Sequence, residues 1–161
     1  KGEKTSDETA EIIYMLAEKI GKKPVMVKDV KGFCLNRFQF AILREAMHIV
    51  ESGIASKEDV DKVFKYGLGM RYASLGPFEI ADLGGLDTFY NIASYLFEDL
   101  SDKKDVNEML KKCFENGDFG TKSGKGFYDY SNGRDQEVIK KRDSDFIKIS
   151  KCLYEEEKNE K

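Results

Sequence analysis

Apolar residues recur at helical spacing near the start of the chain. Thr5 and Glu8 have the spacing of a capping box, in which two side chains satisfy amides of the first helical turn. The residues that follow include apolar positions three and four apart, which lie on one face of a helix: Ile12, Ile13, Leu16, Ala17 and Ile20. The pattern predicts a helix with Thr5 as its N-cap and Gly21 as its terminator.

The segment from Pro24 to Val30 breaks the helical spacing. Its sequence, PVMVKDV, alternates apolar and polar residues around valine, which predicts a short strand. A strand on its own leaves its backbone groups unpaired. We therefore expect this strand to be the last element of a sheet whose other strands lie elsewhere, with a domain boundary near Asp29 to Gly32.

From Gly32 onward the spacing predicts helices almost throughout. The first should run from about Leu35 to Ser52 and end at Gly53. Its expected core residues are Phe33, Phe40, Leu43, Met47 and Val50. Ser56 should cap the next helix, and the Asp59 side chain should bond back to Ser56 as in a capping box. Val60, Val63 and Phe64 should point inward. The further elements expected are helices from Gly76-Pro77 to Gly84-Gly85, from Asp87 to about Leu100, from Val106 to Glu115 and from Arg134 to the end, a loop over 117–126 and a short extended segment over 127–130. The last helix should bury Ile139, Phe146, Ile149 and Leu153, and the terminal residues 155–161 should fray.

Composition and charge exclude several classes of protein. The 161 residues fit one domain, or one domain with a piece of another. A net charge of −3 argues against a nucleic-acid partner. No signal peptide is expected from the first residues, and the sequence has no apolar run of the roughly 18 residues needed to span a membrane. Cys34, Cys113 and Cys152 lack metal-ligand spacing and are expected to be free thiols in the cytoplasm.

Other familiar chemistries also fail on their residue patterns. His48, the sole histidine, has no companion that would make a metal site and no clear partner that would make it a catalytic base. Gly67-Leu68-Gly69 lacks the third glycine of a dinucleotide loop. The stretch 120–126 resembles a P-loop but is one residue short, and Gly126 stands where a magnesium ligand is needed. The charges of 54–66 are too mixed for a DNA-reading helix.

Three ordered segments resemble one family, the 3-hydroxyacyl-CoA dehydrogenases. Residues 31–37 (KGFCLNR) resemble its P-G-F-x-x-N-R segment, although Lys31 replaces the usual proline and Cys34 a usual aliphatic residue. Residues 75–87 (LGPFEIADLGGLD) resemble its G-P-F-E-x-x-D-x-x-G-L-D segment. Residues 120–128 (GTKSGKGFY) resemble its G-x-K-[ST]-G-x-G-F-Y ending. The order and spacing match as well, and the resemblance covers about residues 1–130.

The resemblance implies a mostly helical fold. Residues 31–161 would form the family's C-terminal domain, of the 6-phosphogluconate-dehydrogenase C-terminal-like type, which binds substrate and forms dimers. Residues 1–30 would be a helix–strand remnant of the Rossmann-type, NAD-binding domain. In the family, the dinucleotide loop, the catalytic histidine and the glutamate that orients it precede this region. Because the chain starts at Lys1 without them, we expect upstream sequence to be missing and the chain alone to be inactive.

Two residues acquire functional roles through the resemblance. Asn36 matches a catalytic and substrate-binding asparagine, whose amide can donate to the substrate's carbonyl oxygen. The residues alone favour a helix N-cap instead, and the resemblance reverses that preference. Lys122 matches a lysine that contacts the NAD cofactor, whereas taken alone it could be a solvated loop residue. Glu79 and Asp82 are expected to cap or pair within the helices, and no metal ligand is expected.

The resemblance implies an NAD-dependent dehydrogenase that interconverts short-chain 3-hydroxyacyl-CoA and 3-oxoacyl-CoA. The expected substrate is 3-hydroxybutyryl-CoA. Arg71-Tyr72 resembles the lambda-crystallin and gulonate-dehydrogenase branch, so a sugar-acid substrate is an alternative. A stand-alone helical dimerisation module is another. A homodimer is expected, because these apolar residues exceed what so small a helical cluster need bury: Phe64, Leu68, Met70, Tyr72, Phe78, Leu83 and Phe89.

Overall fold

The computed structural model describes residues 1–155, which are mostly helical. They separate into two compact units, Lys1–Arg44 and Glu45 onward. The expected domain boundary near residue 30 stays a prediction. The expected fraying of 155–161 concerns residues of which 156–161 lie outside the described part of the chain.

The first unit opens with helix α1, Asp7–Lys19. Its N-cap is Ser6, whose side-chain oxygen accepts the amide of Thr9 at 3.1 Å. The prediction of Thr5 was wrong by one residue, because the Thr5 amide instead closes the preceding turn on the Gly2 carbonyl at 3.1 Å. The predicted stop at Gly21 is confirmed: with φ of 79°, it lets the amide of Lys22 reach the Ala17 carbonyl at 2.9 Å.

The segment from Pro24 to Val30 forms no ladder with the described residues. Because the expected strand was to pair with strands that lie elsewhere, it stays a prediction. A strand exists through its hydrogen-bonded neighbours, and none of the described residues supplies a second strand to it. The Val27 carbonyl instead accepts from the amino group of Lys1 at 3.0 Å. A turn then leads into the next helix, with the Phe33 amide donating to the Val30 carbonyl at 3.0 Å.

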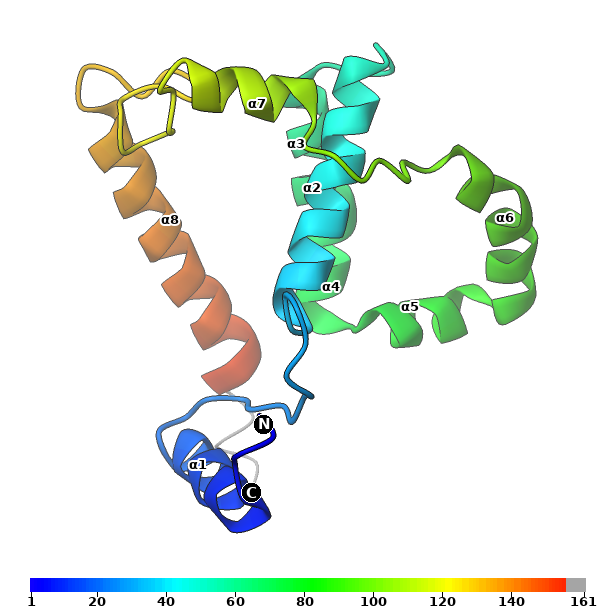
Figure 1. Ribbon diagram of the computed structural model, residues 1–161, viewed down its shortest axis with the longest axis vertical. Helices are drawn as coiled ribbons and strands as arrows, with labels where there is room; N and C mark the ends of the chain where they lie inside the picture. The colour runs from blue at the N-terminus through cyan, green and yellow to red at the C-terminus, as the bar shows by residue number, and fades with distance from the viewer. Residues whose placement is uncertain (156–161) are drawn as a thin grey trace. The chain divides into compact units, whose positions relative to one another are not determined.

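The helices that follow are confirmed close to their predicted limits (Figure 1). Helix α2 begins in the first unit and ends in the second, where Gly53 takes φ of 72°. Ser56 caps α3: its side-chain oxygen accepts the Asp59 amide at 3.1 Å, and its hydroxyl donates to the Asp59 carboxylate at 2.7 Å. The described elements are α2 Leu35–Glu51, α3 Lys57–Lys62, the π-helical segment η1 Val63–Gly69, α4 Met70–Ser74, α5 Pro77–Gly84, α6 Leu86–Asp99, α7 Glu108–Glu115, α8 Arg134–Ser150 and a second π-helical segment η2 Lys151–Glu155.

The joint between α5 and α6 is built on small residues, as the Gly84-Gly85 pair predicts. Gly85 has φ of 89°, and a Cβ on Gly84 would lie 2.6 Å from the Phe89 ring. At the other end of α5, Glu79 accepts the Gly76 amide at 2.5 Å, so its assignment to structure is confirmed. Asp82 contributes its backbone carbonyl to the Gly85 amide at 3.3 Å.

Side-chain burial is much lower than the sequence predicts. Among the described residues, Met47 is the buried apolar residue and Asn107 the buried polar one. Leu43, Val50, Val60, Phe64 and Ile139 are half-buried, so their inward placement is confirmed only in part. The expected burial of these residues was wrong: Phe33, Phe40, Val63, Phe146, Ile149 and Leu153 are exposed. The helices form, but the described residues do not cover their apolar faces.

No described helix combines the length and apolar character that crossing a bilayer demands.

Candidate functional site

Asn36 is the second residue of α2, in the first unit. The helix begins at Leu35, so the N-cap position belongs to Cys34 and the capping interpretation of Asn36 was wrong. The Asn36 side chain is exposed and makes no hydrogen bond to any described residue. Its amide is therefore available to a ligand at the first turn of a helix.

The turn before α2 explains why the helix starts there. Gly32 and Phe33 take φ of 79° and 46°, a left-handed pair that redirects the chain. A Cβ on Gly32 would lie 3.4 Å from the Arg37 side chain and 3.7 Å from that of Asn36, so the turn packs directly against the residues that follow. The Gly-Phe pair of the matched segment thus fixes the position of Asn36 in the helix.

Lys122 lies in the second unit, in a hairpin that we call the lysine hairpin, residues 117–130. Isolated antiparallel bridges join Gly120 to Lys125 and Lys125 to Asp129. The Ser123 hydroxyl is at the centre: it accepts the Phe119 amide at 2.7 Å and donates to the Lys125 carbonyl at 2.9 Å. The predicted loop and extended segment are thus a single closed turn structure, with bridges in place of a strand.

Gly126 has no room for a side chain. A Cβ there would lie 2.7 Å from the Gly120 Cα and 2.9 Å from the Gly120 nitrogen. Both contacts are with backbone, which cannot move aside without opening the hairpin. The glycine that disqualified this stretch as a P-loop is therefore required by close packing.

The hairpin's two lysines differ in their surroundings. Lys125 forms an ion pair with Asp118, with 3.2 Å between Nζ and Oδ2. Lys122 is exposed and has no ion pair with the described residues. Its charge is therefore the one available to an anionic ligand.

Tyr128 ties the lysine hairpin to α3. Its hydroxyl donates to the Asp61 carboxylate at 2.9 Å, and the Lys57 ammonium lies 5.1 Å from the centre of its ring. Burial, and then the hydrogen bond to Asp61, raises the pKa of the Tyr128 hydroxyl to about 12. Sequence reasoning missed Asp61, treating it only as one charge of α3, and gave Tyr128 no role beyond its place in the motif.

Carboxylates of α2 hold the connection between α6 and α7. Glu45 accepts the Ser101 amide at 2.8 Å. Glu51 accepts the Met109 amide and the Asn107 side chain, each at 3.0 Å. The hydrogen bond from the Met109 backbone amide, and then the one from the Asn107 side chain, lower the pKa of the Glu51 carboxyl. The local sequence pattern does not reveal these hydrogen bonds, because their partners are 56 to 58 residues apart.

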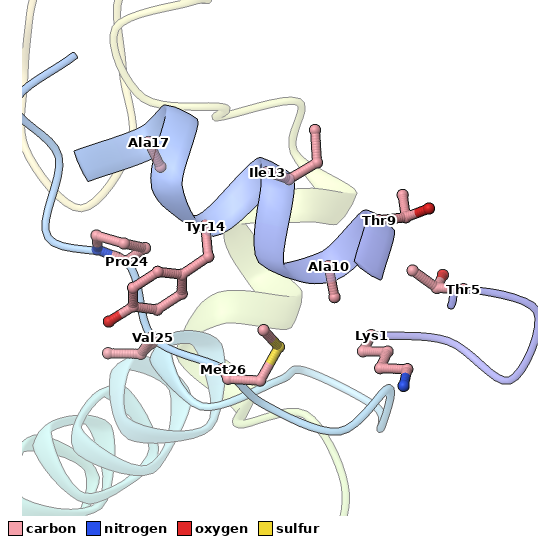
Figure 2. Close-up of a pocket in the computed structure, with 10 residues that line it drawn as sticks. All are labelled: Lys1, Thr5, Thr9, Ala10, Ile13, Tyr14, Ala17, Pro24, Val25 and Met26. Atoms are coloured by element: carbon pink, nitrogen blue, oxygen red, sulfur yellow. The ribbon is translucent and has the colours of Figure 1, made fainter. Parts of the chain in front are cut away.

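The first unit also contains a cavity of about 250 Å³ between α1 and the segment that follows it. Figure 2 shows Tyr14 extending from α1 toward Pro24 and Val25, with Ile13 and Ala17 on the same helix. The lining is mostly apolar. Asn36 and Lys122 do not line it, and they belong to different units.

Comparisons with known proteins agree on one family. The 3-hydroxyacyl-CoA dehydrogenase C-terminal domain matches residues 32–130, which include Asn36 and Lys122. A probable 3-hydroxybutyryl-CoA dehydrogenase of Deinococcus radiodurans is 42% identical over 131 residues, 81% of this chain and 46% of that protein. The 5-formyl-3-hydroxy-2-methylpyridine 4-carboxylate 5-dehydrogenase of Mesorhizobium japonicum is 37% identical over 153 residues, 94% of this chain and 50% of that protein.

A solved structure of a 5-formyl-3-hydroxy-2-methylpyridine 4-carboxylic acid 5-dehydrogenase, an NAD-dependent dismutase, is also similar. It has a TM-score of 0.91 at 36% identity and covers 95% of this chain and 50% of that one. The chain spans about half the length of the curated relatives it matches. The family match covers more than half of the chain, in the region where the helices are confirmed. The chain therefore belongs to the 3-hydroxyacyl-CoA dehydrogenase family and contains its C-terminal domain.

Proposed function

We propose that this chain is the C-terminal part of an NAD-dependent dehydrogenase that interconverts short-chain 3-hydroxyacyl-CoA and 3-oxoacyl-CoA. The substrate that we favour is 3-hydroxybutyryl-CoA. The family match carries the proposal, because it spans both Asn36 and Lys122. The structure leaves both side chains exposed and without a hydrogen bond or ion pair to the described residues. Side chains with such freedom are suited to contact a ligand.

Asn36 acts on the substrate. Its amide N–H donates to the carbonyl oxygen at C3, where negative charge develops as the hydride is transferred. An amide suits this role because it is neutral, so it stabilises the developing charge without trapping the substrate's ground state. Its place in the first turn of α2 adds the positive end of the helix dipole.

Lys122 acts on the cofactor. The lysine hairpin fits an anionic dinucleotide, because it presents one cation while its other lysine is neutralised by Asp118. The chemistry that NAD supplies when bound is acceptance of a hydride from C3 of the 3-hydroxyacyl group. Residues 1–30 are proposed to be the end of the domain that binds most of NAD.

The chain by itself is proposed to be inactive. His48 is half-buried, with its Nδ1 3.4 Å from the hydroxyl of Ser52, the residue just after the end of α2; this is a local contact rather than a base aimed at a ligand. Proton transfer from the substrate hydroxyl needs a base that these residues do not supply.

The working enzyme is proposed to be a homodimer formed through this domain. Several large apolar side chains of α4 to α6 are exposed in the single chain, including Met70, Phe78, Leu83 and Tyr90. Exposed apolar surface of this extent is characteristic of interfaces, and a pair of identical chains would follow two-fold symmetry.

A second candidate function is suggested by the pyridine-carboxylate dehydrogenase. Its match extends over 94% of this chain, beyond residue 130 where the family match ends. A small aromatic carboxylate would then replace the acyl-CoA. The sugar-acid alternative is weaker, because the Arg71 guanidinium that would hold a carboxylate donates to the Gly67 carbonyl at 2.6 Å.

The experiment measures oxidation of NADH by the full-length protein that contains this chain. Acetoacetyl-CoA and 5-formyl-3-hydroxy-2-methylpyridine 4-carboxylate are compared as substrates. Turnover of the first supports the main proposal, and turnover of the second alone replaces it with the other candidate. Activity on neither rejects both.

Asn36→Ala in the full-length protein tests the catalytic role. Loss of a donor to the developing charge should lower kcat and kcat/KM together, by roughly 10²–10³. Because Asn36 does not cap α2, the free energy of unfolding of the variant should differ from that of the parent by less than about 0.5 kcal/mol. Gln39→Ala, an exposed amide on the same helix, is the control. Equal losses in the two variants would show that Asn36 has no specific role.

A further inference from the structure

We propose that Tyr128 and Asp61 are positioning residues for Lys122. Their hydrogen bond holds the lysine hairpin at one place on α3 and so sets where the Lys122 cation meets the anionic part of the dinucleotide. The inference rests on the proposed function, because it requires Lys122 to contact NAD.

The first step is that the lysine hairpin moves as one body. The Gly120 amide donates to the Lys125 carbonyl at 2.7 Å, and the Tyr130 amide donates to the Gly124 carbonyl at 2.9 Å. The Ser123 hydroxyl bridges the two sides, and Gly126 packs directly on Gly120. A displacement at Tyr128 is therefore transmitted to Lys122 rather than absorbed between them.

The second step is that Tyr128 fixes this body to a distant element. It bonds Asp61, which is 67 residues away in the sequence, in a part-buried setting. The Lys57 ammonium covers the ring, and the Lys57 carbonyl lies 3.4 Å from the hydroxyl. A hydrogen bond to a carboxylate is stronger than one between neutral groups, and partial burial reduces its screening by water.

The third step concerns the chemistry of the two ends. The Asp61 carboxylate is occupied by the tyrosine, and the Asp118 carboxylate by Lys125. Both of these carboxylates are thus engaged, which leaves the Lys122 charge unopposed by them. A cation on a flexible stem contributes most to anion binding when its backbone is already placed.

The test uses the full-length enzyme and the variants Tyr128→Phe, Asp61→Ala, Asp61→Asn and Lys122→Met. Tyr128→Phe should raise the KM for NADH about tenfold at unchanged kcat, the size expected for one lost charge-assisted contact. Asp61→Ala should do the same. Asp61→Asn, which keeps an acceptor oxygen, should be milder. Tyr66→Phe, on the exposed tyrosine of η1, is the control and should change nothing.

The decisive measurement is Tyr128→Phe in the Lys122→Met background. A residue that acts through Lys122 should have no further effect on the KM for NADH once that lysine is gone. If Lys122→Met raises this KM and Tyr128→Phe does not, or if the two effects add fully, the positioning role is overturned. If Lys122→Met leaves the KM unchanged, the proposed cofactor contact itself is wrong, and the positioning role falls with it.

Discussion

The lysine hairpin and the helix pair α5–α6 are ordered in opposite ways. The hairpin is closed on itself by backbone bridges, a central serine hydroxyl and a glycine contact. In α5–α6 the backbone is satisfied by helical bonds, but Phe78 is 84% exposed and Tyr90 74% exposed. The hairpin therefore contains the bonds that define its shape, whereas α5–α6 has large apolar side chains that the described residues leave exposed.

This difference matters for function. A segment that closes on itself can place one charge reproducibly, which is what a cofactor contact requires. A helix pair with uncovered apolar faces is suited to association, because covering those faces is favourable and insensitive to direction. The two regions thus support the two separate parts of the proposal, cofactor contact and dimer formation.

The largest effect is expected from Gly126→Ala. The new Cβ would collide with the Gly120 backbone and force the hairpin open, at a cost of about 2–3 kcal/mol in the free energy of unfolding. Gly67→Ala is the control, because a Cβ there meets nothing within 4 Å and alanine favours a helix. Urea unfolding measures both. An unchanged midpoint for Gly126→Ala would show that the hairpin is not closely packed.

Phe78→Ser should come next, with its effect on association. If Phe78 is covered in a dimer, its loss should cost about 2 kcal/mol of association, which raises the dimer dissociation constant roughly 30-fold. Sedimentation across micromolar concentrations measures it. Tyr66→Ser, at 76% exposure on η1, is the matched control. A parent chain that is monomeric throughout this range would contradict the dimer proposal.

Glu51→Gln should have the smallest effect and tests the connection between the two regions. The carboxylate holds Asn107 and the first turn of α7, and its exposure to solvent limits the cost to about 1 kcal/mol at neutral pH. Because the folded state lowers the pKa of Glu51 below its ordinary 4.5, this contribution is present above that value. It is lost as pH falls through the lowered pKa.

Chemical unfolding as a function of pH is the measurement. The parent and Glu51→Gln stabilities should converge in acid. Glu98→Gln, on an exposed carboxylate of α6 without a hydrogen bond or ion pair to the described residues, should differ little at any pH. A constant gap between the parent and Glu51→Gln would show that the charge of Glu51 is not what matters.

The helices could be predicted from the sequence because their signals are local. Gly21 and Gly53 end helices through their own backbone conformation, and Pro77 opens α5 where no amide partner is needed. The exchange of Thr5 for Ser6 as N-cap arose within one turn, where two adjacent hydroxyl residues compete. The strand expected over 24–30 is a different case: its pattern is local, but its existence depends on a neighbouring strand that the described residues do not supply.

The candidate site divides along the same line. The motifs that resemble the family identified Asn36 and Lys122 as candidate site residues, and the sequence left a helix N-cap as the alternative role for Asn36. The start of α2 at Leu35 removes that alternative, because a cap depends on one position in the backbone. The Asp61 partner of Tyr128 could not be found from spacing, since 67 residues separate them.

The sequence by itself determined the family, the order and limits of most helices, and the residue types at the proposed site. These follow from short-range periodicity, glycine and proline chemistry, and ordered motifs. Only the tertiary structure decided which apolar residues are covered, which lysine of the hairpin has no ion pair with the described residues, and which contacts hold the hairpin. Those properties depend on contacts between residues far apart in the chain, and such contacts form and stabilise the protein only when the chain folds.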